Sequence, residues 1–141
     1  MSGFDASRPF EWPVRVYWED TDAQGVVFYA NYFRFLERAR TEWLRALGVD
    51  QVALRRDQRR VFVVASLQAD FVAPARFNDE IVVTARLAAL SRASFDIEQN
   101  IHLDSLEGKL LLRASVRAAY LNADSMRPVR VPESIFEGIK S

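Results

Sequence analysis

The 141-residue sequence contains no cysteine, a single histidine and only five glycines. Without cysteine the chain has no disulfide, no thiolate nucleophile and no cysteine-ligated metal, and His102 alone cannot build the usual zinc site. The glycines are too scattered for a G-x-S-x-G elbow, a P-loop or a G-x-G-x-x-G motif. We therefore expect no metal and no cofactor, and carboxylates become the candidates for catalysis.

The chain also lacks an excess of charge and any long apolar run. Nineteen basic residues balance nineteen acidic ones, so nucleic acid is not an expected partner. The longest apolar runs, such as Val61–Ala65, are far below the ~20 residues that cross a bilayer, and the first thirty residues contain no secretory signal. The sequence predicts a soluble, cytoplasmic protein with a flexible tail, residues 1–9, and a single domain, residues 10–141.

One long amphipathic helix is predicted from Asn31 to Leu47. Its apolar residues recur at spacings of three and four, with charged residues between them. Asn31 is a plausible N-cap, and Gly48 is a plausible residue just beyond the C-terminal end. The apolar stripe comprises Tyr32, Phe35, Leu36, Ala39, Trp43 and Leu47.

Alternating apolar residues predict five strands, at Trp12–Trp18, Val61–Val72, Glu80–Leu90, Ser94–Leu103 and Leu110–Asn122. In the second of these, the apolar face is expected at the odd-numbered positions. One face of a five-stranded antiparallel sheet and one apolar helix can cover each other. The sequence therefore predicts a two-layer α+β domain with the helix lying across the sheet.

The segment between the first strand and the helix is the most unusual part of the sequence. Asp20 and Asp22 precede Gly25 and the predicted helix start at Asn31. The first backbone N–H groups of a helix have no partner within it, so a carboxylate beside them supplies two parts that acyl transfer needs. The alternative is that the two aspartates only shape a turn and cap the helix. The residues alone leave both interpretations open.

The run from Val14 to Tyr32, continuing into Glu37–Arg40, resembles the signature of the 4-hydroxybenzoyl-CoA thioesterase family, and within it the Tol-Pal-associated YbgC branch. Phe71–Asp79 resembles a second motif of the same family. The resemblance implies a hotdog fold, in which a five-stranded antiparallel sheet wraps around one long helix. It also implies dimers or tetramers with active sites at the subunit interface.

This resemblance assigns roles to residues before the helix. Asp22 matches the catalytic aspartate, which acts as a nucleophile or as a general base for water. Tyr29 matches the position whose backbone N–H polarises the thioester carbonyl, although a histidine often stands there in the YbgC branch. Asn31 either orients the turn or touches the substrate. Apart from the resemblance, the aromatic side chain of Phe28 is a candidate wall of the acyl pocket, with core packing as the alternative.

Several charged residues are candidates for secondary roles. Arg92, Arg127 and Arg130 resemble family positions near the bound CoA nucleotide, whose phosphates favour arginine. Glu37 on the helix is predicted to form a structural ion pair or to support the catalytic residues without touching the substrate. The residues expected to pair with Glu37 are Arg34 and Arg40. Four other arginines are alternative candidates for contact with CoA: Arg55, Arg56, Arg59 and Arg60.

The function predicted from the resemblance is hydrolysis of a small acyl-CoA, short-chain or aromatic, to the free acid and CoA. We expect a homo-oligomer, a dimer or a homotetramer, and a place in the Tol-Pal-associated branch. An acyl carrier protein is a further expected partner. A hydratase on this fold would want a histidine near the helix, whereas His102 falls in a strand and is expected to be exposed. The alternative is a non-catalytic hotdog protein that binds an acyl carrier or an envelope-associated complex.

Overall fold

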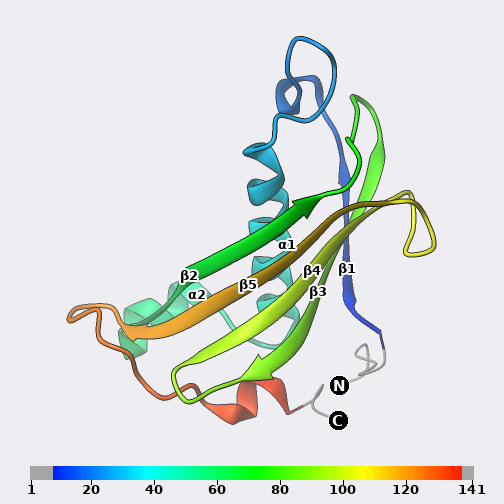
Figure 1. The fold of residues 1–141 in the computed structure, drawn as a ribbon. Helices are drawn as coiled ribbons and strands as arrows, with labels where there is room; N and C mark the ends of the chain where they lie inside the picture. The colour runs from blue at the N-terminus through cyan, green and yellow to red at the C-terminus, as the bar shows by residue number, and fades with distance from the viewer. Residues whose placement is uncertain (1–7, 138–141) are drawn as a thin grey trace.

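A five-stranded antiparallel sheet packs against one long helix, α1, in a computed structural model that describes residues 8–137 (Figure 1). The strands lie in the order β1-β3-β4-β5-β2, so β1 and β2 form the edges. This confirms the predicted α+β architecture. The bounds are α1 Asn31–Ala46, β1 Phe10–Arg15, β2 Arg60–Phe71, β3 Glu80–Leu90, β4 Ser94–Leu103 and β5 Leu110–Asn122.

The ends of the chain are described only in part. Residues 1–7 of the predicted tail, and residues 138–141 of the predicted domain, lie outside the described part. Arg8 bonds to Glu11 at 3.1 Å, and β1 begins at Phe10. Within residues 8–137, no helix combines the length and the apolar character that crossing a membrane requires.

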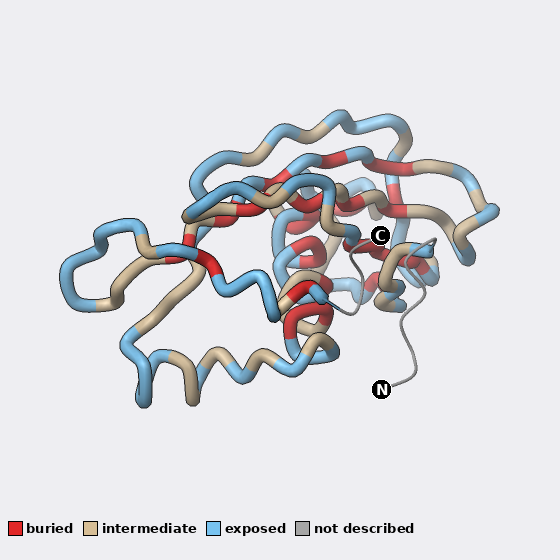
Figure 2. The backbone as a smooth tube through the Cα atoms, turned by 90° about the horizontal axis from the view of Figure 1, so that it is seen from below, coloured by how far each residue is buried: buried red, intermediate tan, exposed pale blue. Residues whose placement is uncertain are grey.

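The three central strands match their predicted bounds, and residues such as Val83, Ile101 and Leu112 join the apolar residues of α1 in one core cluster. Buried residues alternate with more exposed ones along β4 and most of β5 and recur along α1, whereas residues 81–85 of β3 are all buried (Figure 2). Gln99 is the polar member of the buried face of β4, and it is fully buried. Its amide donates to the carbonyls of Leu36 and Thr84 at 3.1 and 3.2 Å and accepts from Arg40 at 3.0 Å. These bonds satisfy the buried amide and tie α1 to the sheet.

The two edge strands differ from their predictions. β1 ends at Arg15 instead of Trp18, because the next residues pair with the turn before β3 and then form a short 3-10 turn, Trp18–Asp20. In β2 the predicted odd-numbered face is wrong for the first half. A bulge between Val64 and Ser66 shifts the register, so Phe62 faces the core before the bulge and Leu67 after it.

The C-terminal end of α1 agrees with the prediction, and its N-terminal end does not. Gly48 has a φ of +97° just beyond the helix, as expected of a C-terminal glycine. The predicted N-cap is wrong: Ala30 occupies that position without a side-chain bond, and Asn31 is the first helical residue. The Asn31 side chain instead reaches back to Asp20, at 2.7 Å.

Besides the turn Trp18–Asp20, three further short helical pieces were not predicted. Gln51–Ala53 forms α2, Leu54–Gln58 continues it as a π-helical turn, and Glu133–Phe136 forms a 3-10 turn. The first two follow α1 and lead into β2. The apolar residues of this stretch, Val52, Ala53 and Leu54, are consecutive and form no apolar stripe by which helical periodicity is recognised.

Candidate active site

Asp22 lies on an exposed loop between the 3-10 turn and α1. Its backbone N–H donates to the carbonyl of Val26 at 2.9 Å, and Gly25 closes the turn with a φ of +77°. One carboxylate oxygen, Oδ1, accepts the N–H of Gln24 at 2.8 Å and that of Val26 at 3.4 Å. Among the described residues, Oδ2 accepts no hydrogen bond. The loop thus anchors one oxygen and leaves the other open to solvent.

Asp20 braces the same loop from three sides. Its Oδ2 accepts the N–H of Tyr17 at 2.8 Å, and its Oδ1 accepts the side-chain amide of Asn31 at 2.7 Å. Its backbone carbonyl accepts the N–H of Phe28 at 3.1 Å. Because these partners are the start of the loop, its end and the first helical residue, Asp20 fixes the loop to the tip of α1. The two aspartates therefore have separate structural roles.

The turn before β3 supports the loop from the other side. Val27 donates to the carbonyl of Ala75 at 2.8 Å, and Phe77 donates to that of Gly25 at 2.9 Å. The buried hydroxyl of Tyr32 accepts the Ala75 N–H at 2.9 Å, and burial raises the pKa of Tyr32 above its ordinary value. The loop is therefore held between α1 and a turn more than forty residues away.

Unpaired amides occur where the loop meets the helix. The N–H groups of Asn31, Tyr32 and Phe33 are bonded to preceding carbonyls at 2.8 to 3.3 Å. Those of Tyr29 and Ala30 donate no hydrogen bond to any described residue. They lie at the positive end of the helix macrodipole, which favours a developing negative charge. Two donors that can stabilise an oxyanion therefore lie in the same loop as the Asp22 carboxylate.

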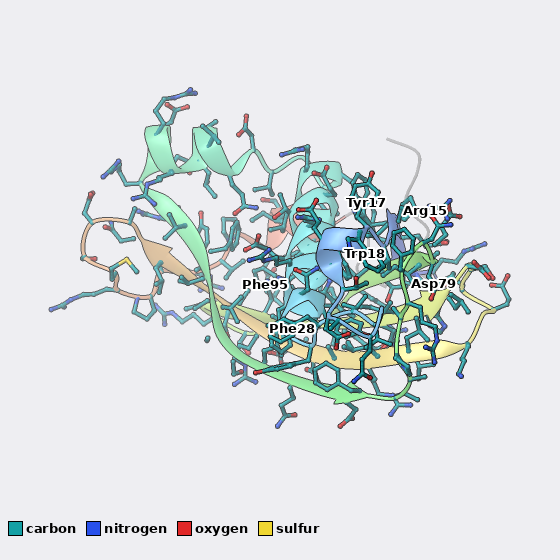
Figure 3. All side chains as sticks on the ribbon, turned by 90° about the horizontal axis from the view of Figure 1, so that it is seen from above. Arg15, Tyr17, Trp18, Phe28, Asp79 and Phe95 are labelled. Atoms are coloured by element: carbon teal, nitrogen blue, oxygen red, sulfur yellow. The ribbon has the colours of Figure 1, made fainter. Side chains whose placement is uncertain are left out.

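Aromatic side chains surround this loop. Tyr17, Trp18, Phe28 and Tyr29 are all at least half exposed, and Figure 3 labels the first three around the start of α1. The rings of Phe28 and Tyr29 lie 5.0 Å apart. Tyr32 is only 4% exposed and belongs to the core. Such a patch of exposed aromatic residues indicates a surface that meets a ligand or another chain.

Two ends of the molecule carry opposite charge. The acidic end, residues 17–30 and 73–79, contains four carboxylates and one arginine, a net charge of −3. The arginine end, residues 51–60 and 122–127, contains five arginines and two aspartates, a net charge of +3. β3 starts beside the acidic end and runs away from it for 11 residues, roughly 33 Å at the usual rise. Figure 1 shows the two ends well separated.

The three arginines predicted at a CoA nucleotide lie away from Asp22 in the same chain. Arg92 follows β3 at its far end, and its carbonyl accepts the N–H of Val131 at 2.8 Å, so Arg92 and Arg130 lie side by side. Arg127 belongs to the arginine end. All three are exposed. One chain thus brings the arginines near one another but not to the acidic end.

Glu37 is exposed on α1 and forms no salt bridge with Arg34 or Arg40 among the described residues. The predicted close ion pair is therefore absent from this chain. Arg40 is partly buried beside it, and this burial lowers the pKa of the guanidinium while the charge of Glu37 raises it. Both line a cavity of about 290 Å³ between α1 and β2, whose other walls include Leu44, Phe62 and Ile97.

Comparison with known proteins decides the family. A sequence profile of the thioesterase-like superfamily matches residues 16–139. The chain belongs to this superfamily. It is 39% identical over 126 residues to the acyl-CoA thioesterase YbgC of Haemophilus influenzae, covering 89% of this chain and 90% of that one. It is 40% identical over 131 residues to the acyl-CoA thioester hydrolase YbgC of Escherichia coli, covering 93% and 96%.

Solved structures of thioesterases have the same fold. A probable thioesterase from Bartonella henselae superposes with a TM-score of 0.82 at 33% identity, covering 89% of this chain and 100% of that one. The 4-hydroxybenzoyl-CoA thioesterase of Pseudomonas sp. strain CBS-3 superposes with a TM-score of 0.83 at 23% identity, covering 92% and 98%, which shows the fold alone. The predicted resemblance and hotdog fold are confirmed.

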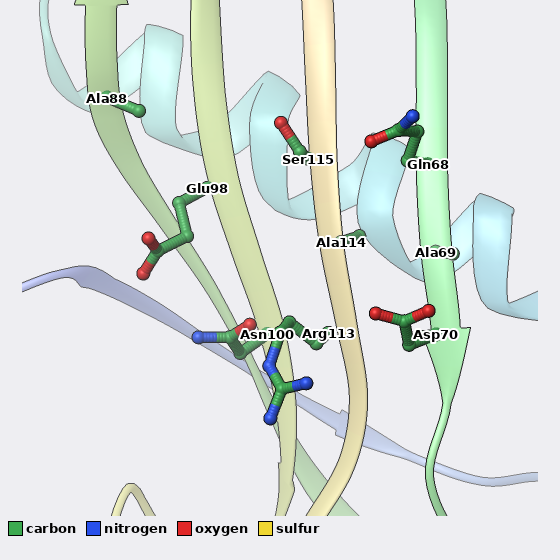
Figure 4. A pocket seen from close by; sticks show the side chains of 9 residues that line it. All are labelled: Gln68, Ala69, Asp70, Ala88, Glu98, Asn100, Arg113, Ala114 and Ser115. Atoms are coloured by element: carbon green, nitrogen blue, oxygen red, sulfur yellow. The ribbon is translucent and has the colours of Figure 1, made fainter.

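The outer face of the hotdog sheet carries a second hollow, of about 760 Å³, on the side away from α1 (Figure 4). Asp70, Glu98 and Arg113 lie around it, and the side-chain oxygen of Asn100 is buried there without a hydrogen bond among the described residues. No helix tip faces this hollow. It therefore lacks the unpaired amides that distinguish the Asp22 loop.

Some features of this thioesterase-like site escaped sequence reasoning. The bond between Asp20 and Asn31 joins residues eleven apart, and the turn at Ala75 reaches the loop across a much longer separation. Local spacing contains no signal for such contacts. His102 was expected to be exposed but is half-buried, with Nδ1 3.1 Å from the carbonyl of Gly108. It lies in β4, away from the loop.

Proposed function

We propose that this chain is an acyl-CoA thioesterase that hydrolyses small acyl thioesters to a free acid and CoA, with Asp22 as the catalytic carboxylate. The observation that supports it most is the pairing of a half-anchored carboxylate with the unpaired amides of Tyr29 and Ala30. Membership of the thioesterase-like superfamily, and relatives named acyl-CoA thioesterases, support the same reaction.

The Asp22 carboxylate can act as a nucleophile or as a general base. Oδ2 of Asp22 attacks the thioester carbonyl and forms an anhydride that water then cleaves, or it removes a proton from a water molecule that attacks instead. In both, the carbon–sulfur bond breaks, one water molecule is consumed, the Asp22 carboxylate is regenerated, and the departing thiolate takes up a proton. The two N–H groups bonded to Oδ1 keep the carboxylate oriented in either case.

The amides of Tyr29 and Ala30 would stabilise the oxyanion that forms on the carbonyl oxygen. One such donor contributes about 2.7–4 kcal/mol in comparable sites. Because the donor is the backbone, tyrosine and histidine at position 29 are equivalent for this step. The exposed rings of Phe28 and Tyr29 remain available for the acyl group, while the Asn31 side chain is bonded to Asp20 and contributes by positioning the loop.

A complete site requires two copies of the chain. β2 is an edge strand of 12 residues with exposed Val63 and Val64, and such an edge favours pairing with another strand. A two-fold axis would pair two β2 strands antiparallel, with Arg60 of one near Phe71 of the other. The rings of Phe71 and Tyr32 lie 5.6 Å apart, so this pairing sets the acidic end of one chain beside the arginine end of its partner.

The finer parts of this proposal rest on the sequence resemblance. They are a preference for short-chain or aromatic acyl groups, a tetramer built from two such dimers, an acyl carrier protein as a further partner, and association with Tol-Pal. Cytoplasmic activity is a separate part of the proposal. Arg92, Arg127 and Arg130 are proposed to face the CoA nucleotide from the partner chain, because their own chain holds them away from Asp22. Glu37 is proposed to act at the α1–β2 cavity through its charge on Arg40.

The test is hydrolysis of a panel of acyl-CoA thioesters, followed by release of free thiol. Asp22→Asn should keep the fold and lower kcat by roughly 10²–10⁴-fold, the usual contribution of a general base. Glu19→Gln, a neighbouring exposed acid, is the matched control and should retain the rate. Wild-type turnover by Asp22→Asn would overturn the assignment. Absence of hydrolysis by the wild type, with a stable acyl-carrier complex, would favour the non-catalytic alternative.

A further inference from the structure

A cavity of about 820 Å³ opens at the arginine end, beside the start of β2. The helical segment after α1 and the turn after β5 form its walls, and the two are tied together by backbone and side chain. Ala123 donates its N–H to the carbonyl of Arg59 at 2.8 Å, and the guanidinium of Arg59 makes two bonds to Asp124. The cavity is therefore a built feature of the fold, formed by residues more than sixty positions apart.

The arginines at this cavity are not all neutralised. Arg56 is paired with Asp57 through bonds of 2.8 and 3.1 Å, and Arg59 is paired with Asp124. Arg60 donates only to backbone carbonyls, at 3.1 and 3.3 Å, and Arg55 makes no hydrogen bond or ion pair among the described residues. Two positive charges thus face a hollow in a chain whose total charge is zero. Such a site attracts an anion.

The backbone around the cavity is strained. Arg59 and Met126 have φ values of 55° and 59°, two of the four positive values among non-glycine residues of the described chain. Leu54–Gln58 is a π-helical turn, a conformation that occurs frequently at functional sites. Each left-handed non-glycine residue costs about 1–3 kcal/mol, and such strain clusters at ligand-binding positions. Here it presents adjacent arginines to one hollow.

Apolar side chains complete the walls. Val52 and Met126 are 75% and 53% exposed, and Phe62 and Val63 at the start of β2 also line the cavity. An anion of purely ionic character, such as free phosphate, would leave these surfaces in water. A ligand that combines phosphates with a flat aromatic base would cover them while its charges meet the guanidinium groups.

We propose that this cavity binds the adenosine 3′,5′-bisphosphate end of CoA, with phosphates on Arg55 and Arg60 and the adenine against Val52 and Met126. The proposal rests on the proposed function for the class of substrate. It adds a binding wall, the segment between α1 and β2, to the arginines predicted after β3 and β5. With two β2 strands paired, this cavity would lie next to the partner's acidic end, so the pantetheine arm would run along the interface.

Calorimetric titration with adenosine 3′,5′-bisphosphate tests the cavity without any thioester. The double variant Arg55→Gln/Arg60→Gln should weaken binding at least about tenfold, because two charge-assisted contacts are removed. Arg113→Gln on the outer sheet face is the matched control and should bind as the wild type does. Circular dichroism melts establish that each variant is folded. Unchanged affinity in the double variant, or an equal loss in the control, would overturn the proposal.

Kinetics separate this proposal from the proposed function. The double variant should raise KM for acyl-CoA about tenfold with kcat retained, and should leave hydrolysis of the N-acetylcysteamine thioester, which has no nucleotide, unchanged. Normal acyl-CoA kinetics in the double variant, with Asp22→Asn inactive, would refute the cavity and leave the function standing. If the wild type hydrolysed no thioester but bound the nucleotide through Arg55 and Arg60, the proposed function would be refuted and the cavity would stand. If the double variant lost affinity for an acidic protein but kept its affinity for adenosine 3′,5′-bisphosphate, the cavity would also be refuted as a nucleotide site.

Discussion

The acidic end and the arginine end differ in charge, in surface and in how their backbones are held. The acidic end surrounds a glycine turn with carboxylates, aromatic rings and two unpaired amides, whereas the arginine end uses strained backbone to gather cations at a hollow. Phosphates would be repelled by the first and attracted by the second. Under the two proposals, thioester chemistry and CoA recognition belong to opposite ends of one chain, so both would serve one substrate only where two chains meet.

Separating the two ends is expected to have the largest effect. Val64→Lys places a charge on the exposed edge of β2, where Val64 is 47% exposed, and should disfavour strand pairing. Light scattering should then show a smaller species, and acyl-CoA turnover should be nearly lost although Asp22 is intact. Ala88→Lys, on the outer face of β3, is the control. A monomer with wild-type turnover would contradict the requirement for two chains.

Weakening the acidic end alone should have the next largest effect. Tyr29→Pro removes the backbone N–H and should lower kcat by roughly 10²–10³-fold, the cost of one oxyanion donor. Tyr29→Ala keeps the amide and removes only an exposed ring, so kcat should change little. The two rates, measured by free-thiol release, distinguish the amide from the side chain. Equal losses in both variants would assign the role to the ring instead.

Loosening the acidic end should cost stability and some activity. Asp20→Ala deprives the N–H of Tyr17 and the largely buried amide of Asn31 of their acceptor. An unsatisfied buried donor costs about 1–3 kcal/mol, so urea denaturation should show a loss of this size. The kcat should fall by less than in Asp22→Asn, because the reacting carboxylate remains. Unchanged stability would show that solvent replaces the brace.

Removing an ion pair that lies outside both the acidic end and the arginine end is expected to have the smallest effect. Arg117 bonds to Asp96 at 2.8 and 3.2 Å on the outer sheet face and holds the pKa of Asp96 below its ordinary value of 3.8. A depressed pKa stabilises the folded state above pH 4, and this contribution is lost as the pH falls through the folded value. Because the pair is solvent-screened, Asp96→Asn should lower the unfolding midpoint only slightly at pH 7. The decrease should be smaller still at pH 3, and turnover should be unchanged. A larger effect at pH 3 would contradict this.

The sequence predicted the regular parts of this fold well. β4 and β5 were bounded correctly because core residues such as Phe95, Ile97 and Ile101 alternate with more polar ones, and β3 because its apolar run is bounded by turn residues on both sides. β2 misled because Phe62 and Val63 are both apolar, and alternation cannot reveal a bulge in such a run. The helical turn at Leu54–Gln58 has no apolar stripe and was missed for that reason.

The candidate site was predictable in its parts but not in its arrangement. Asp22 and Tyr29 were selected by the motif, and their placement in one loop follows from their spacing. The brace from Asp20 to Asn31, and the support from Ala75, depend on tertiary contacts that no local pattern contains. Likewise, the separation of Arg92 from Asp22 becomes visible only when the direction of β3 is known.

Complementation between two impaired variants tests directly whether opposite ends of two chains form one site. One parent is Asp22→Asn, and the other carries Arg92→Gln, Arg127→Gln and Arg130→Gln. In a two-fold dimer of one of each, one site is doubly impaired and the other is intact, so co-expression should restore about a quarter of the wild-type kcat/KM. Activity no greater than the average of the separate parents would contradict the account.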